Sequence, residues 1–382
     1  MDQKVFFENK VDNHVLRKVL SENTNIKTIL LVTGKQSYIN CGADNYITNS
    51  INKDITLIRF FNFSPNPCVK DLKKGLQLFR KNKFDAIIAC GGGSVIDIAK
   101  CIAFFANYHS TVEDYLSGKR NNNLNNIIPI IALPTTAGTG SEATHFAVLY
   151  WNKKKYSVAS PLLLPKAAVI NSSFTECMSS YQTACTGMDA FCQALEAYWS
   201  INSTKESRKY SAEAIKIIVK NIQSAVNNPN SRNRFMMATA AYNAGKAINI
   251  AKTTAAHAIS YSFTSYYNIP HGHAVALTIS DFFNYNSKIT KSECNDFRGH
   301  IFVKKRLGEI VELLGCKSYS EASSFIQKFI LSIGLQISYK KLGITEKNIS
   351  DIVRKVNMER LQNNPRKISD EKLAQILLSH CK

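Results

Sequence analysis

Three consecutive glycines lie between an apolar β-branched run and the start of a helical pattern. Gly91, Gly92 and Gly93 follow the apolar residues 86–89, and the chain continues as Ser94-Val95-Ile96-Asp97-Ile98-Ala99-Lys100. Glycines let a backbone approach a ligand closely, and the open N–H groups that begin a helix favour an anion. A glycine turn without chemical consequence is the alternative. The strand–turn–helix order favours a phosphate-binding loop.

A second loop of small hydroxylated residues follows another apolar run. It reads Pro134-Thr135-Thr136-Ala137-Gly138-Thr139-Gly140-Ser141-Glu142. From a tight turn, its hydroxyl groups can donate hydrogen bonds to phosphate or ribose oxygens; a plain Ser/Thr-rich surface loop is the alternative. Because ligands of open parallel sheets bind at the carboxyl ends of the strands, two such loops predict one nucleotide site.

The first half of the chain contains the elements that must position these loops. Short β-branched runs predict strands over residues 29–33, 55–60, 86–89, 127–133 and 168–170, and helical spacing predicts a helix over 69–81. Buried strands that alternate with helices are typical of a parallel α/β sheet. The Asn-rich residues 121–126 are expected to form a surface loop.

The second half has a different texture. From residue 181 onward the sequence predicts consecutive amphipathic helices, among them 203–223, 231–250 and 369–378, with hardly any strand candidates. Ser203 with Glu206 forms a capping-box pattern, and Ser369 begins the last of these helices. The prediction is therefore an α/β nucleotide-binding domain over residues 1–173 and an all-helical domain over 174–382.

Composition restricts the class of protein less sharply. Lys and Arg number 48 against 28 acidic residues, a formal charge of +20. Nucleic-acid binding is disfavoured because the basic residues are dispersed and no recognition motif accompanies them. Genome base content and a field that attracts anionic ligands remain as explanations, between which charge alone does not decide.

Location and redox state are expected to be those of a cytoplasmic protein. The N-terminus lacks the features of a signal peptide, and no apolar run reaches transmembrane length. Ten scattered cysteines without a CxxC pair predict reduced thiols and neither a disulfide framework nor a zinc ribbon.

Both loops closely resemble the nucleotide loops of the iron-containing (group III) alcohol dehydrogenase family. Further matching motifs cover nearly the whole chain in the right order; they are Ser64-Pro65-Asn66-Pro67, Gly187-Met188-Asp189-Ala190, Pro270-His271-Gly272 and Asn364-Pro365-Arg366. The resemblance implies the two-domain, dehydroquinate synthase-like fold and a nicotinamide cofactor. The cofactor-binding residues that it implies are Asn66, Gly91, Gly92, Gly93, Ser94, Asp97, Lys100, Thr135, Thr136, Thr139 and Ser141.

The same resemblance implies a divalent metal, Fe(II) or Zn(II), held by Asp189, His257 and His271. Gln193 departs from the pattern, because the family usually has histidine four residues after the aspartate. An amide oxygen is a weaker and harder ligand than imidazole. Three alternatives follow: Gln193 is a poor fourth ligand or lies behind the ligands, the metal binds weakly or differs, or the histidines work as proton donors without metal. Tyr261 also stands where the family often has histidine, and either hydrogen-bonds the substrate or fills space.

The end of the first strand bears on the choice of cofactor. Many NAD-using members have an aspartate there, whereas this chain reads Thr33-Gly34-Lys35-Gln36-Ser37. Gly34 leaves room for a 2′-phosphate, and Lys35 and Ser37 supply donors. The hypothesis is a preference for NADPH over NADH, with a solvated Lys35 as the alternative.

Residues ahead of His257 suggest an anionic substrate. Lys252, Thr253 and Thr254 would lie within about one and a half helical turns of that histidine, and a cation with hydroxyl groups suits a phosphonate. His273 and His145 are further candidate donors. These departures resemble the phosphonoacetaldehyde reductase branch of the family, whose members make 2-hydroxyethylphosphonate in phosphonate biosynthesis.

The expected function is NAD(P)H-dependent reduction of a small anionic aldehyde, with Lys252, Tyr261, His257 and His271 as candidate catalytic residues. A general aldehyde or diol dehydrogenase is the first alternative. A phosphorylated-polyol dehydrogenase or cyclase on the same fold and a metal-free nucleotide-binding relative are further ones. The family resemblance also implies a homodimer, and neither a nucleic-acid nor a membrane partner is expected.

Overall fold

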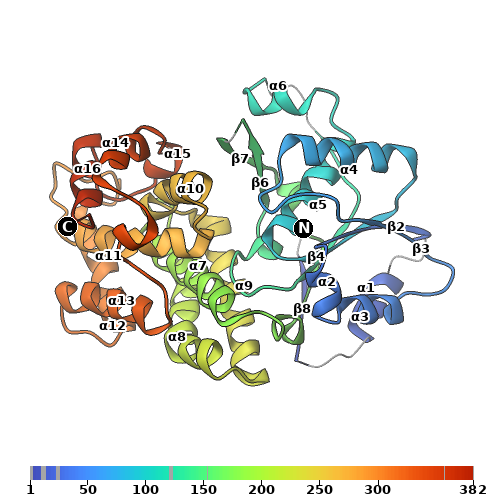
Figure 1. Cartoon of the computed structure of the whole chain (residues 1–382), viewed down its shortest axis with the longest axis horizontal. Helices are drawn as coiled ribbons and strands as arrows, with labels where there is room; N and C mark the ends of the chain where they lie inside the picture. Colours follow the sequence, from blue (N-terminus) through green and yellow to red (C-terminus); the bar gives the residue numbers. More distant parts are fainter. Residues whose placement is uncertain are drawn as a thin grey trace. The chain divides into compact units, whose positions relative to one another are not determined.

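The computed structural model describes residues 3–9, 14–22, 26–119, 124–152, 154–356 and 358–381. Internal contacts divide the chain into two compact units: Met1–Thr136 with Gly140–Met178, and Ala137–Thr139 with Ser179–Lys382. The first unit is α/β and the second is helical, so the predicted fold class is confirmed (Figure 1). Ala137–Thr139, from the middle of the second loop, clusters with the helical unit. The Asn-rich loop lies partly outside the described residues.

A six-stranded parallel sheet forms the frame of the first unit, in the order β1-β8-β5-β4-β2-β3. Its strands are β1 (Lys4–Glu8), β2 (Thr28–Thr33), β3 (Thr56–Phe60), β4 (Ala86–Gly91), β5 (Ile130–Pro134) and β8 (Ala167–Asn171). Five of them were predicted. The strand predicted over 127–133 begins only at Ile130, because Pro129 has no N–H to donate to a neighbouring strand.

Helices cover both faces of this sheet (Figure 1). On one face, Leu30 and Val32 pack with α4 (Val69–Lys81) and α5 (Gly93–Ala106). On the other, Ile29 and Leu31 pack with α1 (His14–Ser21) and α3 (Ala43–Ser50). Successive strand residues point to opposite faces, so continuous apolar strands fill two cores. The remaining short helices of this unit are α2 (Ser37–Asn40), α6 (Val112–Leu116), η1 (Ser141–Ala143), η2 (Pro161–Leu163) and η3 (Ser172–Thr175).

Three strands were not predicted from the sequence. β1 is a short edge strand that pairs only with β8. β6 (Phe146–Trp151) and β7 (Lys154–Ala159) form an antiparallel hairpin apart from the main sheet. Asn152 in the turn between them has a φ of 49°, a left-handed conformation that asparagine tolerates. The polar composition of β7 hides its strand character.

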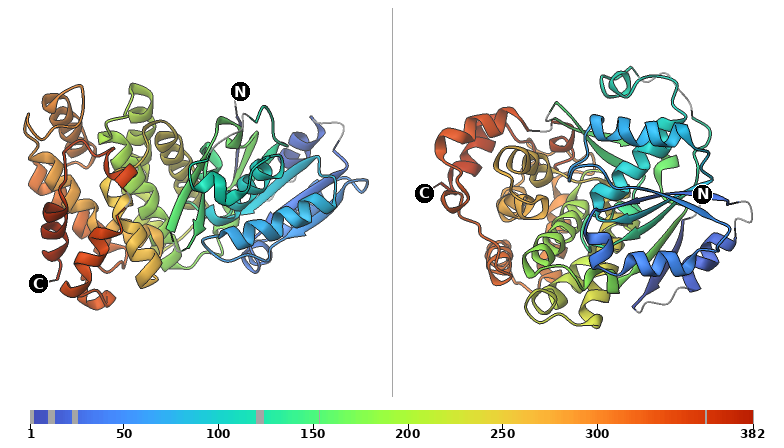
Figure 2. Two further views of the ribbon diagram at one scale, coloured as in Figure 1. Left: turned by 90° about the horizontal axis from the view of Figure 1, so that it is seen from above. Right: turned by 45° about the vertical axis from the view of Figure 1, so that its right-hand side comes forward.

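The second unit consists of helices (Figure 2). Within it, α7 packs against α8, α9 and α11. Its α-helices are α7 (Ser180–Trp199), α8 (Lys205–Asn227), α9 (Ser231–Ala251), α10 (Ala255–Tyr267), α11 (His271–Ser287), α12 (His300–Leu313), α13 (Tyr319–Ser332), α14 (Glu346–Arg354), α15 (Met358–Leu361) and α16 (Asp370–Leu378). A 3-10 turn, η4 (Lys340–Leu342), lies before α14. Ser369 caps α16 as predicted, by accepting from the Lys372 amide.

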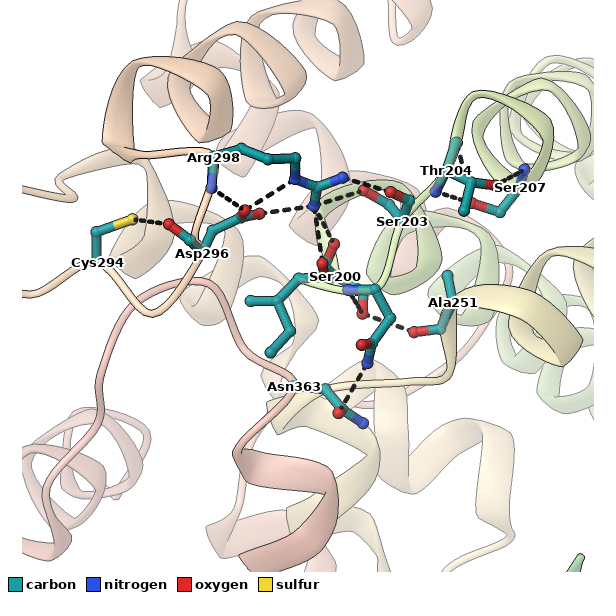
Figure 3. Close-up of polar contacts among 11 residues, drawn as sticks. Ser200, Ser203, Thr204, Ser207, Ala251, Cys294, Asp296, Arg298 and Asn363 are labelled. Atoms are coloured by element: carbon teal, nitrogen blue, oxygen red, sulfur yellow. Dashed lines mark hydrogen bonds and ion pairs between the residues drawn. The ribbon is translucent and has the colours of Figure 1, made fainter.

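The predicted cap of α8 is wrong by one residue. Thr204 caps the helix in a reciprocal box with Ser207. Ser203 instead accepts a hydrogen bond from Arg298, whose guanidinium also binds the Asp296 carboxylate (Figure 3). Arg298 further donates to the carbonyl groups of the turn after α7. Ser203 is therefore bound by a distant arginine and does not provide the cap of α8 that its local sequence had predicted.

Within the described ranges, every helix is too short or too polar to traverse a lipid bilayer. All ten cysteines carry free thiols, in agreement with the absence of a disulfide framework from the sequence pattern. Several of them, such as Cys90 and Cys192, are buried in the cores.

Candidate active site

The triple-glycine segment forms a tight turn between β4 and α5. β4 ends at Gly91, and α5 begins at Gly93 without any side-chain cap. A Cβ atom on Gly91 would lie 2.4 Å from Val95 Cγ2, so this position requires glycine. The Val95 and Ile96 amides already bond to the Gly92 carbonyl. The uncapped turn before them is the kind of helix start that binds phosphate.

Two further loops lie against this turn. The Thr135 amide donates to the Gly91 carbonyl at 3.1 Å, which brings the second loop beside the first, as expected for neighbouring strands β4 and β5. The Asn66 amide donates to Ser94 Oγ at 3.2 Å, and Asn66 has a left-handed φ of 59°. Three segments that the sequence singled out therefore meet at one edge of the sheet.

Lys100 acts behind these loops. Its side chain is fully buried, and its amine donates to the Ser141, Thr144 and Phe146 carbonyls at 2.6–3.0 Å. Burial lowers the pKa of Lys100 to about 8, although Asp97 and Glu142 oppose the shift. Ser141 Oγ donates to Asp97 at 2.7 Å. These bonds tie α5, which carries Asp97 and Lys100, to the residues that follow the second loop. Lys100 therefore positions the second loop, and its amine has no N–H left to donate to a cofactor.

Gly34, Lys35 and Ser37 lie just beyond the carboxyl end of β2, next to β4 in the sheet. Lys35 and Ser37 are exposed, and Gly34 is half-buried. A Cβ on Gly34 would lie 2.2 Å from Ser37 Oγ, so this turn has no room for an aspartate unless Ser37 moves. The local structure therefore agrees with the absence of an acidic residue that would repel a 2′-phosphate.

The second unit brings together the residues predicted to hold a metal. Asp189 lies on α7, His257 in the first turn of α10 and His271 at the start of α11, and their ligand atoms lie within 4.8 Å of one another. Asp189 Oδ1 is 3.4 Å from His257 Nε2 and 3.9 Å from His271 Nε2. Two ligands of a tetrahedral ion are about 3.4 Å apart when each metal bond is about 2.1 Å. The spacing is therefore that of a metal site.

A residue that the sequence reasoning missed, Glu196, orients His257. Its buried carboxylate binds His257 Nδ1 in a very short contact and accepts from the Ala256 amide at 2.8 Å and from Thr254 Oγ1 at 2.8 Å. Glu196 thereby satisfies amides at the start of α10 and leaves His257 Nε2 as the lone-pair nitrogen. The available signal was spacing: Glu196 follows Asp189 by seven residues, two helical turns on the same face.

Charge in this cluster favours a cation. Burial lowers the pKa of His257, but the carboxylates of Glu196 and Asp189 outweigh it and raise that pKa to about 9. Among the described residues, the buried atoms His257 Nε2 and Gln193 Oε1 have no hydrogen-bond partner, although Asp189 Oδ1 lies 3.4 Å from His257 Nε2. Gln193 Nε2 donates to Asp189 Oδ1 at 3.1 Å and to the Thr139 carbonyl at 3.3 Å, which identifies the other amide atom as oxygen. A divalent metal would replace the proton on His257 Nε2 and could take the Gln193 oxygen as a further ligand, so the cluster fits such an ion.

The residues predicted to bind substrate differ in their exposure and in their partners. Lys252 is exposed and follows the last residue of α9, close to the predicted helix end at residue 250. Residues 252–254 are not helical, so the one and a half helical turns expected between Lys252 and His257 do not form. Thr254 is buried and bonded to Glu196 and Trp199, which removes it from a substrate role. Tyr261 stacks beside His271 with ring centroids 6.1 Å apart.

The two extra histidines are held by the fold. His273 is buried, with Nδ1 bonded to Tyr181 Oη at 3.0 Å and Nε2 to the Gln336 carbonyl at 2.6 Å. Burial lowers its pKa, so it is a neutral structural residue. His145 lies in the first unit before β6 and packs edge-to-face on Phe146. The structure shows no role at the metal cluster for either.

A nucleotide-binding parallel sheet joined to a helical unit with an Asp–His–His cluster is the architecture of a metal-dependent nicotinamide oxidoreductase. Residues 3–172 match the family model described as "Iron-containing alcohol dehydrogenase", and residues 183–381 match "Fe-containing alcohol dehydrogenase family, C-terminal". The chain belongs to the iron-containing alcohol dehydrogenase family. It is an NAD(P)-dependent enzyme with a divalent metal, which sets aside the reading as a non-catalytic nucleotide-binding relative.

Individual relatives narrow the comparison. The chain is 31% identical over 306 residues to phosphonoacetaldehyde reductase of Streptomyces viridochromogenes, covering 78% of this chain and 76% of that protein. It is 29% identical to 1,3-propanediol dehydrogenase of Citrobacter freundii, covering 92% and 90%. The crystal structure of sulfoacetaldehyde reductase from Bifidobacterium kashiwanohense in complex with NAD+ superposes with a TM-score of 0.86 at 30% identity, covering 100% and 97%.

Proposed function

We propose that the protein reduces a small anionic aldehyde, with phosphonoacetaldehyde and its product 2-hydroxyethylphosphonate as the first candidates. A divalent ion supplies polarisation of the carbonyl when bound, and the reduced nicotinamide supplies the hydride. Asp189, His257 and His271 would hold the ion, with Gln193 Oε1 as a weaker fourth ligand. Two of the relatives named above carry the names of reductases for two-carbon aldehydes with an anionic group. A homodimer is part of the proposal.

The conformation of Lys252 is the observation that carries the choice of substrate. Lys252 has φ 60° and ψ 173°, in a region that is essentially restricted to glycine and costs other residues about 1–3 kcal/mol. Its side chain is exposed and forms no hydrogen bond or ion pair with the described residues. A cation kept in a strained position without a protein partner, five residues before His257, supports a role in binding an anionic substrate.

Replacing Lys252 with glycine tests this role because stability and activity should move in opposite directions. Relief of backbone strain should raise the free energy of unfolding by about 1 kcal/mol. Loss of the charged donor should lower kcat/KM for phosphonoacetaldehyde by about 10- to 100-fold. Turnover of butyraldehyde should stay within about twofold. Steady-state NAD(P)H oxidation and urea unfolding measure the two effects.

Asn152→Gly provides the matched control, because Asn152 also has a positive φ and lies in the β6–β7 turn. It should leave the turnover of both aldehydes unchanged. Equal losses on both aldehydes in Lys252→Gly would remove Lys252 from substrate binding. A wild-type enzyme that prefers butyraldehyde or propanediol over phosphonoacetaldehyde would favour the general alcohol dehydrogenase, which the 1,3-propanediol dehydrogenase relative makes the second candidate.

Gln193→His tests the proposed fourth ligand. Imidazole is a stronger ligand than an amide oxygen for Zn(II), so the variant should bind Zn(II) about tenfold more tightly. Competition with a chromogenic chelator measures this affinity independently of turnover. Because the amide is also bonded to Thr139, a stability measurement should accompany it. If Zn(II) affinity stays constant or falls in a fully folded variant, Gln193 is not a ligand.

A further inference from the structure

Arg59 lies at the edge of the sheet where the adenosine half of a dinucleotide would bind, and the sequence reasoning had passed over it. It belongs to β3, opposite Leu31 of β2. Its Nε donates to Thr33 Oγ1 at 2.7 Å, and Nη2 donates to the Gly34 carbonyl at 2.9 Å and the Lys35 carbonyl at 3.2 Å. The guanidinium is thus fastened to the Gly34 turn, one strand away from the strand that ends in the triple glycine.

Two aromatic rings hold this guanidinium. Its carbon is 4.5 Å from the centroid of the buried Tyr38 ring and 4.6 Å from that of the exposed Phe61 ring. Stacking on aromatic faces fixes the plane of the group and makes it a preorganised donor. Within the described part of the chain, Arg59 has no carboxylate partner, and Nη1 has no assigned acceptor. Within the described ranges, Asp44 also forms no ion pair with Arg59.

We propose that Arg59, together with Lys35 and Ser37, binds the 2′-phosphate of NADPH and makes the enzyme prefer NADPH over NADH. A half-buried, stacked and unpaired guanidinium is a geometry that suits a phosphate dianion. Strand order places the triple-glycine turn, the Gly34 turn and Arg59 on consecutive strands about 4.8 Å apart. A dinucleotide whose pyrophosphate binds the triple-glycine turn would therefore place its adenine ribose beside the Gly34 turn. The inference deepens the proposed function, on whose use of a reduced nicotinamide it rests.

Arg59→Met is the decisive variant, because it retains an apolar stem between the two rings. We expect it to lower kcat/KM for NADPH by about 10- to 100-fold, as for the loss of one charge-assisted phosphate contact, and to change kcat/KM for NADH by less than about twofold. Binding of adenosine 2′,5′-bisphosphate should weaken equally, and ADP binding should stay constant. Arg80→Met, an exposed arginine on α4, is the matched control and should alter neither ratio.

A second variant with a gain of function is needed, because Arg59→Met could also disturb the Gly34 turn that Arg59 binds. Gly34→Asp combined with Ser37→Ala removes the 2.2 Å conflict and places a carboxylate at the ribose position, so preference should shift toward NADH by at least about tenfold. Equal losses with NADH and NADPH in Arg59→Met would overturn the role of Arg59 in selectivity. A wild-type preference for NADH would overturn the use of NADPH itself. If the wild-type enzyme prefers NADPH and Arg59→Met keeps that preference, Arg59 does not determine the choice of cofactor.

Discussion

Gly272→Ala should abolish metal binding and lower kcat/KM by at least about 100-fold, because a displacement of about 1 Å at reacting groups has effects of that size. Gly272 is the second residue of α11, directly after His271. A Cβ there would lie 1.8 Å from the Cys185 carbonyl oxygen and 3.0 Å from Asp189 Cβ. Helix α11 must therefore move away from α7, which carries His271 away from Asp189. We also expect a destabilisation of about 3 kcal/mol from overpacking.

Metal content by elemental analysis and chemical unfolding test this prediction together. Gly308→Ala is the control, because Gly308 lies inside α12 and its added Cβ would meet only Tyr319 Oη, at 3.9 Å. That variant should gain about 0.5–1 kcal/mol of stability, since alanine favours a helix interior over glycine. A Gly272→Ala protein that retains stoichiometric metal and normal turnover would show that α7 and α11 do not pack as closely as described.

Glu196→Gln should weaken metal binding by about 10- to 100-fold, with a comparable loss of kcat/KM at limiting metal. Glu196 accepts hydrogen bonds from donors only: the Thr254 hydroxyl, the Ala256 amide and a ring nitrogen of His257. A glutamine has one oxygen to offer, and its NH2 group would face a donor. If that group meets His257 Nδ1, the imidazole proton moves to Nε2 and blocks the nitrogen that the metal requires.

The control for this variant is Glu309→Gln. Glu309 is also a hydrogen-bonded carboxylate of the helical unit, since it accepts from Tyr198 Oη at 2.9 Å and binds Arg306 at 2.7 Å. Its amide variant should lose some stability and keep the metal affinity of the wild type. Chelator competition at fixed pH measures both proteins. Unchanged affinity in Glu196→Gln would limit Glu196 to its contacts with the start of α10.

Local patterns predicted the elements that local forces build. Helix α4 begins and ends at the predicted residues 69 and 81, because Val69, Leu72 and Leu76 repeat at helical spacing on one buried face. The edge strand β1 and the hairpin β6–β7 were missed, because short or polar strands carry little pattern of their own. The cap of α8 was misplaced, because Arg298 occupies Ser203 from 95 residues away.

For the candidate site, residue types were predictable and partners were not. The composition and order of the chain predicted the glycine and threonine loops. The family resemblance predicted the metal ligands Asp189, His257 and His271. The burial of Lys100 was not visible, because its acceptors lie 41 to 46 residues further along the chain. The end of α9 near residue 250 was predicted, but the left-handed conformation of Lys252 was not, because residues 252–254 include no glycine to mark it.

The sequence by itself determined the α/β and helical halves and the glycine turn between β4 and α5, because each depends on periodicity or on a motif within a few residues. The candidate metal ligands, which are far apart in the chain, were implied by the family resemblance. Only the tertiary structure decided that Glu196 orients His257, across 61 residues, and that Arg59 faces the Gly34 turn from the neighbouring strand. A single buried carboxylate or arginine leaves no periodic signal. Its role arises from the neighbours that folding brings to it, and these contacts are long-range in sequence.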